Sequence, residues 1–293
     1  MITSNTAFRF AKCIVALGTF DGVHIGHARV IEAAKRHNLP VVVVTSIQNP
    51  KFVLSGIGAR IISPSLCDEA FEMLGVQAVI RLDFNEIKDM SPIEYLEILT
   101  DKIGAVGFAC GYNFRFGKSA SGTAKTISEY AKENGFVFDV CEEVDIDGFT
   151  VSSTRIRELI ANGDIKYANT LLGRPYGFDF EVIHGDARGR TIGFPTLNQQ
   201  YPDGYILPKF GVYASRVTVN NQRYTSITNV GIRPTFKVDK ALAETTIDGF
   251  TGDLYGRHIK TELIEFIRPE KKFDSLEALK TQIQNDIENS KRI

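Results

Sequence analysis

The chain has 293 residues, of which 43% are hydrophobic and 24% charged, and its formal net charge is −1. This length suggests about two domains, and the near-zero charge argues against a nucleic-acid partner, because proteins that hold many phosphates carry a basic surface. The apolar run "PVVVV" is far too short to span a membrane, and the N-terminal "MITSNTAFRF" lacks the features of a signal peptide, so we expect a soluble, cytoplasmic protein without a membrane partner.

In the first half of the chain, short apolar runs alternate with amphipathic segments. We predict strands at 13–20, 40–47, 77–84, 105–111 and 136–144, and helices at 26–38, 91–103 and 123–135. Ser91 and Pro92 mark a helix start and Gly135 a helix end. Two short helices, broken at Asn162-Gly163, are expected next. Apolar strands separated by helices indicate an α/β fold with a parallel sheet and right-handed crossovers.

Beyond residue 174, period-2 and β-branched stretches bounded by Gly, Pro and Asn replace this pattern. We predict strands at 178–185, 211–219, 222–231 and 259–267, with Asn220-Asn221 at the tip of a hairpin. Apolar residues at 276, 279, 283 and 287 form one helical stripe. We therefore expect a small antiparallel β-barrel with a C-terminal helix packed on it, and we divide the chain into domains 1–173 and 174–293.

The four cysteines, Cys13, Cys67, Cys110 and Cys141, lie in or beside apolar segments and show no C-x-x-C spacing. Buried, reduced thiols are therefore favoured over disulfides or zinc ligands.

The stretch "GTFDGVHIGH", residues 18–27, falls between the first predicted strand and the first helix. In a parallel α/β sheet, ligands bind at the carboxyl ends of the strands, where helix N-termini favour a phosphate. Two of its glycines permit tight turning and close approach of a ligand, and His24 and His27, three residues apart, can face the same ligand. The predicted ATP-binding residues of this stretch are Gly18, Phe20, Asp21, Gly22, His24, Gly26 and His27.

A second candidate phosphate motif, "SSTRIR", occupies residues 152–157. Hydroxyls at a helix N-terminus and guanidinium forks suit phosphate oxygens, although alone the motif would read as an ordinary N-cap beside exposed arginines. Together with H-x-G-H it predicts one ATP site. The residues assigned to it are Ser152, Ser153, Thr154, Arg155 and Arg157.

The loop "GYNFRFGKSASG", residues 111–122, follows another predicted parallel strand and should line the same pocket. We expect Phe114 and Phe116 to contact the core in part, and we choose Asn113 for the polar contact to substrate, with Phe114 and Arg115 beside it.

In the second half, "HGDARGRTIGFPTLN", residues 184–198, is the most specific string. Its glycines would form a mobile loop able to wrap a nucleotide. Thr196 and Asn198 are two apart on an extended chain and so share one face, with Leu197 on the other. A hydroxyl oxygen beside an amide oxygen suits Mg²⁺, which keeps waters and substrate phosphates as its other ligands. The residues assigned to this nucleotide site are Gly185, Gly189, Arg190, Gly193, Pro195, Thr196 and Asn198, the last two also as metal ligands.

These motifs resemble known families. The stretch at 18–27 is similar to the H-x-G-H signature of the nucleotidyltransferase superfamily, in which the histidines stabilise the α-phosphoryl group of ATP as pyrophosphate leaves. The string at 184–198, followed in order by "GVYA", "NVGIRPTF", "DLYG" and "FIRPEKKFDSLEALKTQIQNDI", resembles the riboflavin kinase signature. The combination, covering about residues 13 to 289, looks like the bacterial bifunctional riboflavin kinase/FAD synthetase family.

The resemblance implies a nucleotidyltransferase-type α/β domain followed by a six-stranded barrel. It further implies ATP-dependent phosphorylation of riboflavin to FMN and adenylylation of FMN to FAD, with Mg²⁺ accompanying ATP. Glu244 in "AETTIDGF" matches the family's catalytic carboxylate. Such a group is chemically required, because an alcohol that attacks a phosphoryl group must lose its proton, and a positioned carboxylate contributes about 10²–10⁴-fold. The oligomeric state is not predicted.

The sequence departs from the family pattern at three places. Gln48 replaces the first proline of a Pro-x-Pro element in Gln48-Asn49-Pro50, at a loop that should border the adenylyltransferase pocket. Thr246 and Gly249 replace the residues usual after the glutamate, with Asp248 one position early. Leu197 replaces a small residue. Because its side chain is predicted to point away from the metal, we expect this substitution to have little effect.

Two alternatives stay open on sequence alone. One is an adenylyltransferase that acts on another phosphorylated acceptor, and the other is a flavin-binding protein that has lost one activity.

Overall fold

The computed structural model describes residues 2–4, 9–47, 53, 56, 58–185, 194–233 and 240–293. The chain divides into two compact units. The first comprises Met1–Ala59 with Cys67–Ser153, and the second comprises Arg60–Leu66 with Thr154–Ile293. The sequence-based boundary at residue 174 falls inside the second unit and stays a prediction. No helix in the described part of the chain is long and apolar enough to cross a lipid bilayer.

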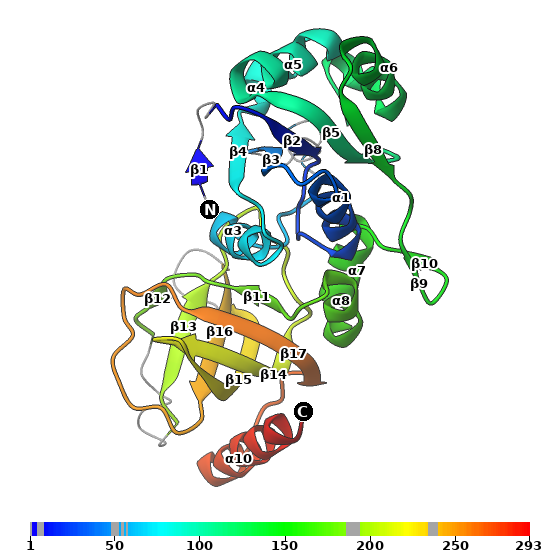
Figure 1. The fold of residues 1–293 in the computed structure, drawn as a ribbon. Helices are drawn as coiled ribbons and strands as arrows, with labels where there is room; N and C mark the ends of the chain where they lie inside the picture. Colours follow the sequence, from blue (N-terminus) through cyan, green and yellow to red (C-terminus); the bar gives the residue numbers. More distant parts are fainter. Residues whose placement is uncertain are drawn as a thin grey trace. The chain divides into compact units, whose positions relative to one another are not determined.

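The first unit is built on a six-stranded, wholly parallel sheet in the order β1-β4-β3-β2-β5-β8 (Figure 1). The five strands predicted from the apolar runs are confirmed. The sixth, β1, was not predicted, and it extends one edge of the sheet beside β4. The strands are β1 (Ile2–Ser4), β2 (Cys13–Leu17), β3 (Val41–Ser46), β4 (Ala78–Leu82), β5 (Ala105–Gly111) and β8 (Val137–Cys141).

Helices cover both faces of this sheet. Val15 and Leu17 of β2 pack in one core cluster with residues of α5, η1 and α6. Strand alternation turns the equally buried Ile14 and Ala16 to the other face, and α1 contacts β2, β3, β5 and β8. The helices of this part of the chain are α1 (Ile25–Lys35), α3 (Pro64–Met73), α4 (Phe84–Ile87), α5 (Pro92–Ile98), the π-helical turn η1 (Leu99–Ile103) and α6 (Ala124–Asn134).

Local signals set the helix ends where the sequence predicts them. Ser91 caps α5 in a reciprocal capping box with Glu94, and Pro92 occupies its first turn. Gly135 ends α6 in the left-handed conformation, with φ of 67°. The helix expected over 91–103 is α5 continued by η1. Short elements fill the connections: β6 (Arg115–Phe116), η2 (Lys118–Ala120), β7 (Gly122–Thr123), β9 (Asp145–Ile146) and β10 (Phe149–Thr150).

The second unit holds α7 (Ser153–Asn162), α8 (Ile165–Leu172) and an antiparallel sheet in the order β11-β17-β14-β15-β16-β13-β12 (Figure 1). The two short helices break where expected, with Gly163 at φ of 84°. The strands are β11 (Tyr176–Phe178), β12 (Val182–Ile183), β13 (Thr196–Gln200), β14 (Gly211–Val219), β15 (Gln222–Arg233), β16 (Lys240–Ile247) and β17 (Lys260–Arg268). Asn220 and Asn221, both with positive φ, form the β14–β15 turn as predicted.

The antiparallel sheet has seven strands, whereas the family resemblance implied a barrel of six. The reason is local: β11 and β12 belong to one segment that is interrupted at residues 179–181, and its two parts pair with different strands. Between them, Glu181 forms an isolated antiparallel β-bridge, through the backbone, with His258 just before β17. The two ends of the strand order are therefore consecutive in the chain, and the strand predicted at 178–185 covers β12 together with the last residue of β11.

The C-terminal helix α10 (Leu276–Arg292) packs on β14 and β15, as its apolar stripe predicts. Ile287 and Ile283 meet Val212 and Ile227 in one apolar cluster. The helix is also held by charge, because Arg268 of β17 donates to Asp286, whose side chain is 1% exposed, through Nε at 3.0 Å and Nη2 at 2.8 Å.

Candidate functional sites

The H-x-G-H stretch begins where β2 ends, at the switch point of the parallel sheet. From β2 the chain proceeds through β3 and β4 on one side, whereas β5 and β8 lie on the other. Ligands of open α/β sheets bind at the carboxyl ends of strands at such a point. The loop 18–24 and the start of α1 therefore occupy the position where the fold class provides a crevice.

The two histidines of this stretch stack on each other. His24 is the N-cap of α1, and its Nδ1 accepts a hydrogen bond from the backbone N–H of His27 at 3.3 Å. The two rings are 3.6 Å apart with 16° between their planes. Because Nδ1 of His24 accepts, its ring proton resides on Nε2, which leaves Nε2 as a donor.

Neighbouring residues fix the position of these rings. The ring of Phe20 is buried and packs 5.1 Å from that of His27 and edge-on to Phe71 at 5.6 Å. Phe20, assigned to the ATP site from the sequence, thus supports a histidine from within the core. A Cβ on Gly26 would lie 3.1 Å from the His24 imidazole, and Gly22 adopts φ of 84°. Gly26 is therefore required because the His24 ring approaches it closely, and Gly22 is required by its backbone conformation.

The other predicted residues of the stretch, Gly18 and Asp21, lie in the same loop. A Cβ on Gly18 would come within 3.0 Å of the Phe20 ring. The backbone carbonyl of Asp21 accepts a hydrogen bond from Ser153 Oγ at 2.8 Å. The structure therefore joins the start of the second motif to the first. Ser152 is half-buried beside it, and Thr154, Arg155 and Arg157 follow in the first turns of α7.

The loop after β5 leaves the same edge of the sheet as the H-x-G-H loop, because β2 and β5 are parallel neighbours. Asn113 and Arg115 are exposed there. Phe114 stacks on Phe116 at 5.5 Å, and both pack against the core, as predicted in part. Asn113 is thus available to a ligand at this edge, whereas the ring of Phe114 has a structural role.

In the second unit, β13, β16 and β15 bring three polar side chains into one row. Asn198 pairs in register with Glu244, and Glu244 pairs with Asn229. Facing residues of antiparallel strands point to the same side of the sheet, so the Glu244 carboxylate lies between two carboxamides. Thr196 pairs with Thr246 one step along the same face. Leu197 points the other way into an apolar cluster with Val182 and Val217.

Asn198 is the residue that best fits a bound cation. It is 3% exposed, and its Oδ1 is buried without a hydrogen-bond partner among the described residues. Its amide packs so closely on Gly185 that a Cβ there would lie 2.5 Å from Nδ2. An unpaired buried carbonyl oxygen is costly unless a ligand uses it. The donor set of Thr196 and Asn198 is therefore compatible with a hard cation such as Mg²⁺. Within the described ranges, no group of three or more His, Cys, Asp or Glu residues is placed to hold a metal.

Some sequence predictions fall on residues outside the described ranges. These are Gly189, Arg190 and Gly193 of the glycine-rich loop, and Gln48, Asn49 and Pro50 of the departure after β3. Pro195, in contrast, is exposed immediately before β13. At the other departures, Thr246 is 6% exposed in β16. Asp248 forms an ion pair with Lys291 of α10 at 3.0 Å, and Gly249 adopts φ of 67° in the following turn.

Asn229 was not among the predicted site residues. It lies in "NVGIRPTF", a string that matched the family but was assigned no role. Its side chain donates through Nδ2 to Glu270 Oε1 at 3.1 Å, and its Oδ1 is buried without a partner in the described part of the chain. Only the register of β15 against β16 reveals its position beside Glu244.

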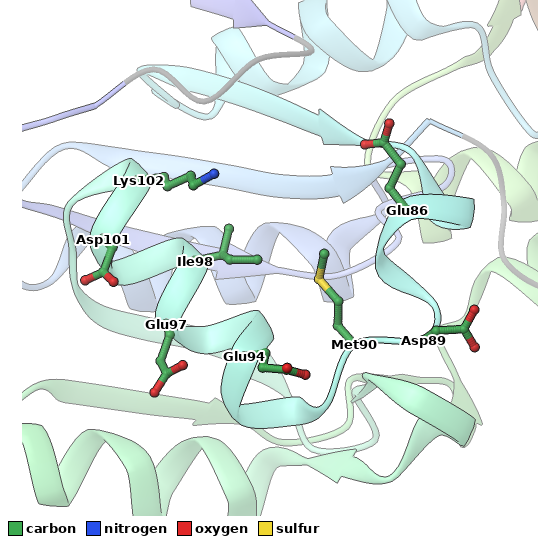
Figure 2. A pocket seen from close by; sticks show the side chains of 8 residues that line it. All are labelled: Glu86, Asp89, Met90, Glu94, Glu97, Ile98, Asp101 and Lys102. Atoms are coloured by element: carbon green, nitrogen blue, oxygen red, sulfur yellow. The ribbon is translucent and has the colours of Figure 1, made fainter.

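A separate pocket of 530 Å³ lies over α4, α5 and η1 (Figure 2). Five carboxylates and a single ammonium group line it, together with Met90 and Ile98. Because that charge would repel a triphosphate, the pocket is not a candidate ATP site, and none of the residues predicted from the motifs lines it. The charged lining residues are Glu86, Asp89, Glu94, Glu97, Asp101 and Lys102.

Comparison with known proteins agrees with the two-unit organisation. A family model described as FAD synthetase matches residues 8–155, and one described as riboflavin kinase matches residues 172–293. The chain is 35% identical over 288 residues to the bifunctional riboflavin kinase/FMN adenylyltransferase of Listeria monocytogenes, covering 95% of this chain and 91% of that protein. It is 36% identical over 288 residues to the protein of the same name from Bacillus subtilis, with 94% and 90% covered.

Among solved structures, the chain is similar to a crystal structure described as a macrolide-efflux protein from Streptococcus pneumoniae. The TM-score is 0.89 at 30% identity, and the match covers 100% of this chain and 99% of the other.

Proposed function

The chain belongs to the bifunctional riboflavin kinase/FMN adenylyltransferase family, and we propose from this premise how its residues divide the two reactions. The enzyme phosphorylates riboflavin to FMN and adenylylates FMN to FAD, each with ATP. The match of a FAD synthetase model to residues 8–155 supports FMN, rather than another phosphorylated compound, as the acceptor of the adenylyl group. We assign phosphorylation to the β-barrel domain, 174–293, and adenylylation to the α/β domain, 1–173.

In the kinase reaction, the 5′-hydroxyl oxygen of riboflavin attacks the γ-phosphorus of ATP, and ADP leaves. We assign to Glu244 the acceptance of the hydroxyl proton as the new P–O bond forms. Thr196 and Asn198 would hold Mg²⁺, which when bound neutralises charge on the transferred phosphoryl group. Gly185, which we assign to the nucleotide, packs on Asn198, so the nucleotide and the metal would bind side by side. Gly189, Arg190, Gly193 and Pro195 are assigned to the nucleotide.

In the adenylyltransferase reaction, a phosphate oxygen of FMN attacks the α-phosphorus of ATP, and pyrophosphate leaves. We assign to His24 the donation of a hydrogen bond from Nε2 to a phosphate oxygen, because its Nδ1 is occupied by the His27 backbone N–H. His27 would act on the same phosphates, together with Ser152, Thr154, Arg155 and Arg157. Asn113 and Arg115 would contact FMN from the loop beyond β5, next to the strand that leads to the histidines.

One observation carries the assignment of the kinase site: the register that aligns Asn198, Glu244 and Asn229 across β13, β16 and β15. Three residues from sequence positions far apart supply a carboxylate and two amide oxygens to one face. A hydrocarbon cluster of Val212, Ile227 and Ile287 adjoins this row, since Val212 faces Asn229 in register. A polar reactive end beside an apolar surface suits a flavin, whose fused aromatic ring has an apolar dimethylbenzene edge and whose chain carries hydroxyls.

The test is a pair of variants that separate the two reactions. Glu244→Gln should lower FMN formation from riboflavin by at least about 100-fold while supplied FMN is still converted to FAD. His27→Ala should do the reverse. Matched controls are Glu181→Gln, an exposed glutamate beside β12, and His37→Ala, at the far end of α1, both expected to leave the two rates unchanged. If either test variant silenced both reactions while the fold survived, the division of sites would be wrong.

We further propose that the enzyme works in the cytoplasm with small-molecule substrates only. The net charge of −1 and the finding that no described helix could span a bilayer support this view.

A further inference from the structure

The row of side chains in the kinase site continues past Glu244 to Asn229, which the proposed mechanism leaves without a role. Asn229 faces Glu244 on β16 and Val212 on β14. It therefore lies between the proposed general base and the apolar cluster. A flavin that contacts both Glu244 and the apolar cluster would therefore lie across Asn229.

The orientation of the Asn229 carboxamide is fixed by Glu270. The two are joined by a hydrogen bond of 3.1 Å from Asn229 Nδ2 to Glu270 Oε1. A carboxylate can only accept hydrogen bonds, so the amide nitrogen must face Glu270 and the amide oxygen must point elsewhere. The Glu270 carboxylate in turn lies directly over Gly231, where a Cβ would overlap Oε1. Thus Gly231 makes room for Glu270, and Glu270 orients Asn229.

The carbonyl oxygen presented in this way accepts no hydrogen bond from any residue in the described ranges. Oδ1 of Asn229 is buried and has no hydrogen-bond partner among the residues that the structure describes. Burial of an unsatisfied acceptor is costly, and folded proteins tolerate it chiefly where a ligand completes the bond. The missing partner must be a donor, because an acceptor oxygen repels phosphate oxygens. This excludes the nucleotide phosphates.

Two groups in this reaction could interact with such an oxygen, Mg²⁺ and the hydroxyls of riboflavin. The spacing favours the hydroxyls. Asn198 and Asn229 lie on opposite sides of Glu244, two strand spacings or about 10 Å apart at the backbone. Two ligands of one Mg²⁺ are within about 4 Å of each other, so Asn229 is poorly placed to share the metal of Asn198. One strand spacing, about 4.8 Å, separates it from Glu244. Side chains that start this far apart can each reach one of two neighbouring hydroxyls of one chain.

We propose that Asn229 Oδ1 accepts a hydrogen bond from the 4′-hydroxyl of the ribityl chain while Glu244 accepts the proton of the 5′-hydroxyl, and that Glu270 is a positioning residue for Asn229. The inference rests on the proposed role of Glu244. Recognition of two adjacent hydroxyls fixes the chain in register with the phosphoryl donor. Such a site selects a polyol over an analogue that lacks the second hydroxyl.

The experiment measures kcat/KM for FMN-type product formation from riboflavin and from 4′-deoxyriboflavin. With the unaltered enzyme, removal of the 4′-hydroxyl should lower kcat/KM by at least about tenfold. Asn229→Ala should lower kcat/KM for riboflavin by the same factor, mainly through KM, and should lose nothing further on the deoxy substrate. An equal loss on both substrates, or no loss on riboflavin, would overturn the proposal. So would a change in the Mg²⁺ concentration needed for half-maximal rate.

Glu270 is tested by its own pair of variants. Glu270→Ala should reproduce part of the loss on riboflavin but not on the deoxy substrate, whereas Glu270→Gln keeps an acceptor for Asn229 Nδ2 and should restore most of the rate. Gly231→Ala, which removes no polar group, should behave like Glu270→Ala. If Glu270 had a purely structural role, Glu270→Ala would instead lower kcat/KM for both substrates alike, and Glu270→Gln would not restore the rate.

Two further measurements separate a failure of this inference from other failures. The thermal unfolding of each variant reports that the barrel is folded, whereas conversion of supplied FMN to FAD reports only on the α/β domain. Glu244→Gln tests the proposed base by itself. If that variant still phosphorylated riboflavin, the assigned base would be wrong, whereas the comparison of the two substrates in Asn229→Ala would still decide the role of Asn229.

Discussion

At the scale of single residues, the function of the histidine pair depends on Gly26. We expect Gly26→Ala to push the His24 imidazole off its position, because a Cβ at residue 26 would lie 3.1 Å from that ring. A small misplacement of a group that contacts the reacting phosphates costs about 10- to 100-fold in rate. The rate of FAD formation from supplied FMN measures the effect. Glu32→Ala, an exposed change in the same helix, is the control. An unchanged FAD rate in Gly26→Ala would contradict the assigned position of His24.

The cysteines give a second residue-scale prediction. Burial raises the pKa of the Cys13 and Cys110 thiols to about 12, so both stay protonated near neutral pH. Burial also raises the pKa of Cys141, which is only half-buried, as is Cys67. Because the thiolate is the reactive form, iodoacetamide should spare Cys13 and Cys110 in the native protein and modify them only after denaturation. Mass spectrometry of tryptic peptides reads this out. Rapid modification of either residue in the folded enzyme would contradict the described burial.

The sequence groups individual residues into candidate sites only where a motif names them. H-x-G-H and Pro-Thr-x-Asn place a glycine, a histidine pair and two side chains with oxygen atoms within a few positions, so local geometry suffices to group them. Asn229 and Glu270 are 41 residues apart. Nothing in the local pattern joins them, because their relation depends on strand register and on the path of the chain after β17. Phe20 shows the converse: it lies within a motif, but its ring serves the core.

At the scale of elements, α10 depends on a buried ion pair. Asp286→Ala should lower the free energy of unfolding by about 3 kcal/mol, because it leaves the Arg268 guanidinium without its buried partner. Since α10 borders the apolar cluster of the kinase site, the temperature at which riboflavin phosphorylation is lost should fall as well. Glu288→Ala, which removes an exposed partner of Lys291 on the same helix, should cost about 0.5 kcal/mol or less. Equal effects of the two changes in thermal unfolding would contradict this view.

Elements with strong patterns were predictable, and elements set by pairing were not. Local sequence patterns alone predict the strands β2, β3 and β5, which are continuous apolar runs, and the capped helix that starts at Ser91. The strand β16, which carries Glu244, was not predicted. Its pattern mixes alanine and threonine, and its identity comes from pairing with β13 and β15 on both sides. The break between β11 and β12 likewise reflects a change of partner strand rather than a turn signal.

At the scale of the whole molecule, the position of the domain boundary can be tested with fragments. Asn169 of α8 donates to the backbone carbonyl of Leu263 in β17 at 3.0 Å and accepts from the backbone N–H of Tyr176 in β11 at 2.6 Å. Ile165 and Leu171 of the same helix are fully buried, and burial of each such side chain is worth roughly 1.5–3 kcal/mol. A fragment of residues 154–293 should therefore melt at a clearly higher temperature than one of 174–293. Equal melting temperatures would show that α7 and α8 belong energetically with the first half.

The proposal that each half of the chain has its own ATP site is tested most directly by complementation between variants. Glu244→Gln and His27→Ala are incubated with riboflavin, ATP and Mg²⁺, separately and mixed, and the flavins are separated by chromatography. We predict that Glu244→Gln alone forms FMN at least about 100-fold more slowly than the unaltered enzyme, that His27→Ala alone accumulates FMN without FAD, and that the mixture forms FAD. A mixture of the two folded variants that forms no more FAD than either variant alone, or a single variant that makes FAD from riboflavin at the unaltered rate, would contradict this division of the two reactions.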